Sequence, residues 1–317
     1  MTGPSVEWLA QPAVLPWVAL ILGLCVGSFL NVVIYRLPRM MEREWLSQMP
    51  ETLEEAALLK DQPQGQPQLA RVANEVRVLV EPATRGHLSL VTPRSHCPGC
   101  AKPISLARNV PVLSYVLLRG RCANCATRIS PRYPAIELLA GIGAFYCAWR
   151  FGFTAQAIAA TLFIWAVIAL AVIDQETGFL PDDITLPLMW LGLLFNTAAV
   201  FVPLHEAVIG AAAGYLVLWT INATFRLLRG MDGMGYGDFK MTAAVGAFLG
   251  WRELVMVILL SSVVGALFGS LQMFAARRGW DWKFRFHFGP YIAIAGVAAM
   301  LWGAEIARRV PALRPFS

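Results

Sequence analysis

The chain contains the stretch Val14–Val33, VLPWVALILGLCVGSFLNVV, which is twenty residues long and carries no charge. A helix of this length crosses a hydrocarbon layer about 30 Å thick, so we expect it to span a membrane. The composition agrees, because apolar residues make up 57% of the 317 residues and charged residues only 15%. A typical soluble domain has about 25% charged residues. The sequence therefore predicts a membrane protein.

Six further apolar runs follow, and a shorter one that contains glycine, Met241–Leu249, could cross the bilayer or line a cavity within it. The predicted fold is an all-α polytopic membrane protein with about eight transmembrane helices. We divide it into a first span (1–38), a soluble insert (39–135) and a transmembrane core (136–317). The six runs are Ile136–Trp149, Thr154–Ile173, Ile184–Val202, Ala207–Phe225, Leu254–Ala275 and Pro290–Ile306.

Lysine and arginine residues near the ends of these spans are unequally distributed. Eight spans would place fourteen of them on the side of the insert and five on the opposite side. Because basic residues concentrate on the cytosolic side of membrane proteins, we expect the insert in the cytosol and both chain ends outside. The net charge of +6 thus lies beside the membrane and does not indicate a nucleic-acid partner.

The insert contains two Cys-x-x-Cys pairs. Cys97 and Cys100 form the first pair, and Cys122 and Cys125 form the second, with twenty-one residues between the pairs. Four thiolates presented by two tight turns match the tetrahedral coordination of structural zinc. We therefore predict a zinc knuckle at about residues 92–134. A redox site is the alternative, but a redox motif needs only one such pair.

The earlier part of the insert is less informative. Met41–Lys60 has the apolar spacing of a helix, and Asp61–Gln68 has the Gln and Pro content of a linker. We assign no function to residues 39–90.

Carboxylates in or beside membrane spans are costly and are therefore candidate functional groups. Most have structural explanations; Asp182 and Asp183, for example, are placed to cap the helix that follows. The candidates are Glu137, Asp174, Glu176, Asp182, Asp183, Glu206, Asp232, Asp238 and Glu253.

Asp174 and Asp238 have no such explanation. Asp174 ends an apolar run, where a carboxylate opposes the helix dipole, and Asp238 follows the glycines of Gly235-Tyr236-Gly237. The predicted topology puts both at the cytosolic boundary. Two neighbouring carboxyl groups in a poorly hydrated cleft share one proton, which supplies a base and an acid for peptide hydrolysis. A membrane transporter that couples ions to an acidic pair is an alternative from a different class.

Several motifs together resemble the bacterial prepilin peptidases, a family of aspartic membrane proteases. The motifs follow one another in the order typical of that family, and together they extend over most of the chain. They are Gly27-Ser28-Phe29-Leu30-Asn31-Val32-Val33-Ile34-Tyr35-Arg36-Leu37-Pro38, the four cysteines with Asn109-Val110-Pro111 and Leu113-Ser114-Tyr115, Ile129-Ser130-Pro131-Arg132-Tyr133-Pro134, Leu180-Pro181-Asp182 with Thr185-Leu186-Pro187, Gly235-Tyr236-Gly237-Asp238-Phe239-Lys240 and Phe288-Gly289-Pro290.

The resemblance implies a location in the inner membrane of bacteria and an active site made by Asp174 and Asp238. It also implies cleavage of the basic leader from type IV prepilins and type II secretion pseudopilins. The new N-terminus would then be methylated with S-adenosylmethionine, and Gly120 is our candidate residue for that second site. The alternatives are a general GxGD-type intramembrane aspartic protease without methyltransferase activity and a non-catalytic assembly factor that docks through the zinc knuckle.

Overall fold

The computed structural model describes residues 11–58, 66–84, 86–97, 99–105, 109–275 and 287–309. Within these ranges the chain is mostly helical, and its only strand-like pairings are two isolated bridges, His96 with Pro103 and Arg121 with Arg128. The helices are α1 (Leu15–Leu58), α2 (Gln66–Thr84), α3 (Leu113–Leu117), α4 (Arg132–Phe151), α5 (Ala155–Thr177), α6 (Asp182–Thr197), α7 (Leu204–Arg229), α8 (Tyr236–Ala275) and α9 (Gly289–Arg309).

Five of the described helices are long and apolar enough to cross a bilayer: α1, α5, α7, α8 and α9. This supports a multi-pass membrane protein. The predicted spans in α4 and α6 are helical but are not among the five, and α6 has only 16 residues. A helix of that length rises about 24 Å, less than a hydrocarbon layer of about 30 Å. The count of about eight spans stays a prediction.

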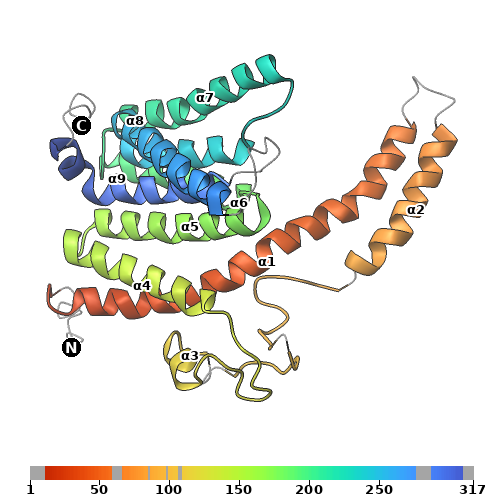
Figure 1. The fold of residues 1–317 in the computed structure, drawn as a ribbon, viewed down its shortest axis with the longest axis horizontal. Helices are drawn as coiled ribbons and strands as arrows, with labels where there is room; N and C mark the ends of the chain where they lie inside the picture. The colour runs from red at the N-terminus through yellow and green to blue at the C-terminus, as the bar shows by residue number, and fades with distance from the viewer. Residues whose placement is uncertain are drawn as a thin grey trace, which may run out of the picture.

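The helices α4, α5 and α9 lie side by side in a bundle (Figure 1). Helix α6 packs against α5, α8 packs against α9, and α7 packs on α6 and α8. Small residues let some helices approach very closely. A Cβ added to Gly246 of α8 would lie 2.2 Å from the carbonyl oxygen of Gly210 in α7. Close packing at small residues is the usual way in which membrane helices associate.

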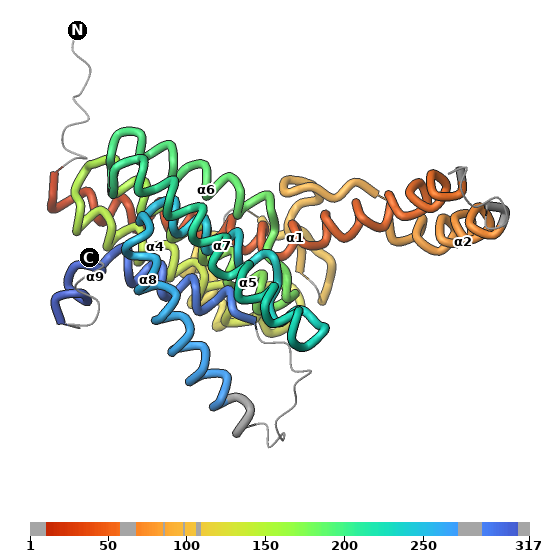
Figure 2. Tube along the Cα trace, turned by 90° about the horizontal axis from the view of Figure 1, so that it is seen from above, coloured from red at the N-terminus to blue at the C-terminus, as the bar shows by residue number. Residues whose placement is uncertain are grey.

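A break at Gly250 divides α8 into the two segments that the sequence predicted separately. Gly250 has φ 77° and ψ 176°, so it is not helical. Asn196 of α6 stabilises the break, because its side-chain amide donates to the carbonyls of Ala247 and Phe248, both at 2.9 Å. These carbonyls would otherwise lack helical partners. Beyond the break, α8 extends away from the bundle (Figure 2).

Helix α1 is much longer than the predicted first span and continues to Leu58 past Pro38 and Pro50. Its second half packs against α2, and the pair projects from the bundle as a helical arm (Figures 1 and 2). The predicted helical character of residues 41–58 is confirmed, but the domain boundary predicted at residue 38 falls inside this helix. Most of the predicted linker at 61–68 lies outside the described residues, and its last three residues belong to α2.

The segment that carries the cysteines is attached to α1 and α4 by buried polar side chains. Arg36 is only 6% exposed and donates to the carbonyls of Ser89 at 2.8 Å and Pro93 at 2.6 Å. Asn31 donates to the carbonyl of Tyr133 at 3.1 Å, and Glu137 accepts from the backbone N–H of Val112 at 2.7 Å. These bonds fix both ends of the cysteine-bearing segment relative to α1 and α4.

Candidate active site and metal centre

Both predicted aspartates line one cavity of about 370 Å³. Asp174 lies in the last turn of α5 and Asp238 in the first turn of α8, and both are buried, at 5% and 8% exposure. The loop between α5 and α6 forms part of the wall. The complete lining is Met41, Trp45, Asp174, Gly178, Phe179, Leu180, Asp182, Gly235, Tyr236, Gly237, Asp238 and Lys240.

Asp174 is held by the start of α9. The backbone N–H of Gly289 donates to Asp174 Oδ2 at 3.0 Å. Gly289 is required for this contact, because a Cβ there would lie 2.8 Å from the same oxygen. A helix N-terminus carries partial positive charge and favours a carboxylate. On the other side of α5's end, a Cβ on Gly178 would lie 3.3 Å from His287 Nε2, so that ring also lies next to the cavity.

Asp238 has a different environment. Its backbone N–H bonds to the carbonyl of Gly235, whereas its Oδ1 is buried and has no hydrogen-bond partner among the described residues. Buried acceptors of this kind are rare in folded proteins and mark candidate functional groups. Gly237 allows the close approach of this turn, because a Cβ there would lie 2.7 Å from the Cβ of Leu180.

The cavity also contains an ion pair. Lys240 Nζ donates to both carboxylate oxygens of Asp182 at 2.7 Å. Asp182 was expected to cap α6, but the residue at the cap position is Pro181, and no side chain caps this helix. Asp182 instead lies in the first turn, where its charge is favourable to the helix dipole, and joins α6 to the turn that bears Asp238.

Helix α1 supplies a wall of the cavity that the sequence did not predict. Met41 and Trp45 line it, although residues 39–90 were assigned no function. Trp45 is 54% exposed and contacts Phe179 edge to face, with ring centroids 5.3 Å apart. The helical spacing of residues 41–60 indicated a helix but not its partner. Gly289 and Lys240 were also missed, although they stand in two of the motifs noted in the sequence.

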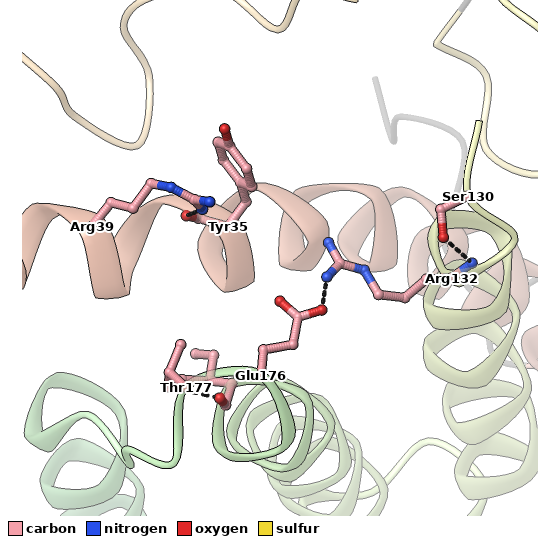
Figure 3. Close-up of polar contacts among 7 residues, drawn as sticks. Tyr35, Arg39, Ser130, Arg132, Glu176 and Thr177 are labelled. Atoms are coloured by element: carbon pink, nitrogen blue, oxygen red, sulfur yellow. Dashed lines mark hydrogen bonds and ion pairs between the residues drawn. The ribbon is translucent and has the colours of Figure 1, made fainter. Parts of the chain in front are cut away.

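A further ion pair lies beside the end of α5. Arg132, in the first turn of α4, pairs with Glu176, two residues after Asp174 (Figure 3). The backbone N–H of Arg132 is itself bonded to the hydroxyl of Ser130. The pair connects the exit of the cysteine-bearing segment to the helix end that positions Asp174.

The four cysteines converge on a separate site. The sulfur atoms of Cys97, Cys100, Cys122 and Cys125 all lie within 4.8 Å of one another, and Cys97 Sγ lies 3.7 Å from Cys125 Sγ. Four sulfurs placed tetrahedrally at the usual Zn–S distance of about 2.3 Å are about 3.8 Å apart. The four sulfurs therefore fit a tetrahedral metal ion.

The backbone around these thiols suits thiolates. The N–H of Gly99 donates to Cys97 Sγ at 3.4 Å, and that of Asn124 to Cys122 Sγ at 3.5 Å. The Thr127 hydroxyl and backbone lower the pKa of Cys125 to about 6, and backbone bonds from Asn124 and Cys125 lower the pKa of Cys122. The backbone bond from Lys102 lowers the pKa of Cys100, but burial and the neighbouring thiols outweigh it and raise this pKa to about 11. Metal ions bind the deprotonated form of cysteine, so the contacts of Cys122 and Cys125 favour binding.

Gly120 does not line the aspartate cavity and lies two residues before Cys122. It has φ +67°, and a Cβ there would lie 2.9 Å from Tyr115 Oη. Tight packing in a turn therefore accounts for this glycine. It lines a second cavity, of about 570 Å³, together with Arg119, Arg121 and Arg128.

Comparisons with known proteins identify the family of the chain. Residues 21–151 match the Bacterial Peptidase A24 N-terminal domain, and residues 161–270 match the Type IV leader peptidase family. Among curated proteins, the chain is 45% identical to a prepilin leader peptidase/N-methyltransferase of Stutzerimonas stutzeri, covering 95% of this chain and 96% of the relative.

Proteins of the same name from Pseudomonas aeruginosa and Burkholderia pseudomallei are 41% and 42% identical. These matches cover 96% and 95% of this chain, and 97% and 90% of the relatives. No solved structure matches the chain. Similarity of this extent over nearly the whole length shows that the chain belongs to the type IV leader peptidase family, which is a family of aspartic peptidases.

Proposed function

We propose that this chain cleaves the leader from type IV prepilins and pseudopilins in the cavity lined by Asp174 and Asp238. One observation carries the proposal: two buried carboxyl groups from separate helices line the same cavity. The names of the relatives supply the substrate class. Membership of a peptidase family also argues against the transporter and the non-catalytic assembly factor as alternatives.

The two aspartates have different surroundings, and we assign their roles accordingly. Asp174 accepts the N–H of Gly289 at the start of α9, so its site stabilises a carboxylate and suits the base. Asp238 Oδ1 has no partner in the described part of the chain, which suits a carboxyl group that keeps a proton to donate.

The hydrolysis then follows in two steps. Asp174 takes a proton from water as the water oxygen bonds to the scissile carbonyl carbon, and Asp238 gives its proton to the carbonyl oxygen. When the carbon–nitrogen bond breaks, the proton held by Asp174 passes to the leaving amine, and Asp238 recovers its proton from the hydroxyl of the tetrahedral intermediate. Because both groups share one proton, their titrations are coupled.

We infer that the active site faces the bacterial cytosol. The excess of basic residues on the side of the insert supports this orientation in an inner membrane crossed about eight times, with both chain ends outside. A prepilin has a charged leader followed by an apolar helix, so the bilayer would hold its cleavage junction at the depth of the cavity. The division into 1–38, 39–135 and 136–317 stays a prediction, and Met41 and Trp45 of the insert would serve the cavity of the core.

The four cysteines are proposed to hold one structural zinc ion. With four protein ligands the site has no open position, so the metal would stabilise the knuckle and not activate water.

N-methylation with S-adenosylmethionine is the second proposed activity, and it rests on the names of the relatives. The cavity beside Gly120 does not fit this donor well, because three arginines line it and the donor has a cationic sulfonium. We place donor binding in the insert without assigning further residues, and the role of Gly120 stays a prediction.

The test is processing of a synthetic prepilin by the purified full-length protein, with and without S-adenosylmethionine, followed by mass spectrometry. Asp174→Asn and Asp238→Asn should each abolish cleavage, whereas Asp183→Asn, an exposed neighbour outside the cavity, should cleave normally. Substantial cleavage by either of the first two variants would refute the two-aspartate mechanism. Normal cleavage without methylation of the product would leave the general GxGD-type peptidase as the correct description.

A further inference from the structure

The segment between Glu81 and Glu137 has an unusual charge distribution. It contains eight lysine and arginine residues and no aspartate or glutamate. A zinc ion bound by four thiolates would add only two negative charges, so the segment stays strongly positive. The eight cations are Arg85, Arg94, Lys102, Arg108, Arg119, Arg121, Arg128 and Arg132.

Three of these cations gather at the cavity of about 570 Å³, which is lined by Arg119, Arg121 and Arg128 and by no acidic residue. All three side chains are exposed, and in the described part of the chain none has an ion-pair partner. The backbone beneath them is well ordered by hydrogen bonds, including the bridge between Arg121 and Arg128 and the bond from Ile129 N–H to the carbonyl of Gly120. Guanidinium groups placed in this way suit a phosphate group.

Helix α3 precedes this cavity in the chain and exposes an apolar face. Leu113, Val116 and Leu117 are 54%, 62% and 72% exposed, and residues three and four apart lie on the same side of a helix. The start of α3 is held close to the first turns of α4 by the bond from Val112 N–H to Glu137, and Figure 1 shows α3 beside the α1 and α4 pair. With the insert on the cytosolic side, as proposed above, the apolar face and the arginines would lie near the cytosolic ends of α1 and α4.

We propose that this surface binds the membrane: Arg119, Arg121 and Arg128 hold the phosphate of an anionic phospholipid, and Leu113, Val116 and Leu117 insert among its acyl chains. The combination favours a lipid over a soluble phosphate, because a soluble ion would leave the apolar face in water. It also matches the usual composition of interfacial segments, which pair basic residues with apolar ones. The contact would set the height of the knuckle above the bilayer.

The experiment is hydrogen–deuterium exchange of the full-length protein in nanodiscs, either of phosphatidylcholine alone or with about a third phosphatidylglycerol. We expect slower exchange of residues 110–131 when phosphatidylglycerol is present. Each arginine near an anionic surface contributes roughly a fivefold factor, so Arg119→Gln with Arg128→Gln should reduce the protection up to about thirtyfold. The matched control is Arg71→Gln with Arg94→Gln, which removes two exposed arginines outside the cavity and should keep the protection.

Equal exchange rates in the two lipids would overturn the proposal. So would an equal loss of protection in the control variant, which would indicate a general charge effect. If inorganic phosphate added to the protein in detergent gives the same protection, the cavity binds free phosphate and the lipid assignment is wrong. Unchanged metal content in each variant shows that the knuckle is folded. Asp238→Asn should keep the slower exchange in phosphatidylglycerol, because lipid binding does not depend on the peptidase mechanism.

Discussion

Gly289 and Asp174 are 115 residues apart in sequence and joined by a hydrogen bond of 3.0 Å from the backbone N–H to Oδ2. The bond brings the start of α9 to the end of α5, next to the turn that carries Asp238. It also fixes one carboxyl oxygen in a cavity where an oxygen of the other aspartate has no hydrogen-bond partner among the described residues. The relationship makes the two aspartates chemically different, and it can be tested directly.

Gly289→Ala should greatly reduce peptidase activity, because the new Cβ would lie 2.8 Å from Asp174 Oδ2 and must displace it. Misplacement of a catalytic group by about 1 Å can cost about a hundredfold in rate, so we expect kcat to fall by about that factor. The control is Gly296→Ala on the same helix, whose Cβ would meet Phe163 at 3.2 Å, away from the cavity. If both variants lose the same activity, crowding of α9 and not displacement of Asp174 is the cause.

Lys240→Gln and Asp182→Asn should each lower kcat/KM, because each removes one half of the ion pair that joins α6 to the turn of Asp238. The side chains are 29% and 46% exposed, so solvent screens the pair and we expect a coupling of about 0.5–1 kcal/mol. A double-mutant cycle measures it. Strictly additive effects of the two substitutions would show that the pair does not act as a unit.

Trp45→Ala should raise KM several-fold with a smaller effect on kcat. The indole lines the cavity and contacts Phe179, but it makes none of the contacts that hold the aspartates. Loss of a contact that stabilises the bound substrate and the transition state equally raises KM and leaves kcat unchanged. Trp190→Ala removes a tryptophan outside the cavity that is 61% exposed, against 54% for Trp45, and should leave both constants unchanged. A fall in kcat with constant KM for Trp45→Ala would assign this residue to the chemical step instead.

Cys97→Ser should lose the bound metal and destabilise the knuckle, because three thiolates bind zinc far more weakly than four and the metal contributes directly to folding. Metal content by mass spectrometry should fall from about one zinc per chain towards zero, and limited proteolysis should cut residues 92–134 faster. Cys25→Ser is the control, since Cys25 lies in α1 outside the cluster. Purified protein without stoichiometric zinc would contradict the structural-zinc proposal.

Arg36→Gln should lower the thermal stability of the protein. Arg36 is buried and its two bonds hold the carbonyls of Ser89 and Pro93. Ser89 is half-buried and Pro93 exposed, so water replaces part of the lost bonds, and we expect a loss of about 1 kcal/mol. Arg39→Gln is the control, because in the described part of the chain that side chain bonds only to the carbonyl of Tyr35 in its own helix and lies over its ring (Figure 3). An equal change in melting temperature for the two variants would show that the contact between α1 and the segment does not stabilise the fold.

Local patterns in the sequence were enough for part of this structure. The uncharged run at Val14–Val33 predicted a helix, and the pairs at Cys97 and Cys122 predicted four converging sulfurs, because helical hydrophobicity and tight cysteine turns involve residues close in the chain. The predicted topology also placed Asp174 and Asp238 at one depth, and the cavity contains both. The length of α1 was underestimated, because proline at 38 and 50 usually ends a helix and its packing with α2 is invisible in sequence.

What the tertiary structure alone decided is which distant groups meet. The packing of whole helices decides that the N–H of Gly289 reaches Asp174 and that Lys240 pairs with Asp182. It also decides that Trp45 lines the cavity. The sequence by itself determined the membrane setting, the helices and the candidate residues, since these follow from the chemistry of neighbouring side chains. Their distances and environments, and hence the different roles that we propose for two identical carboxyl groups, follow from long-range packing between helices.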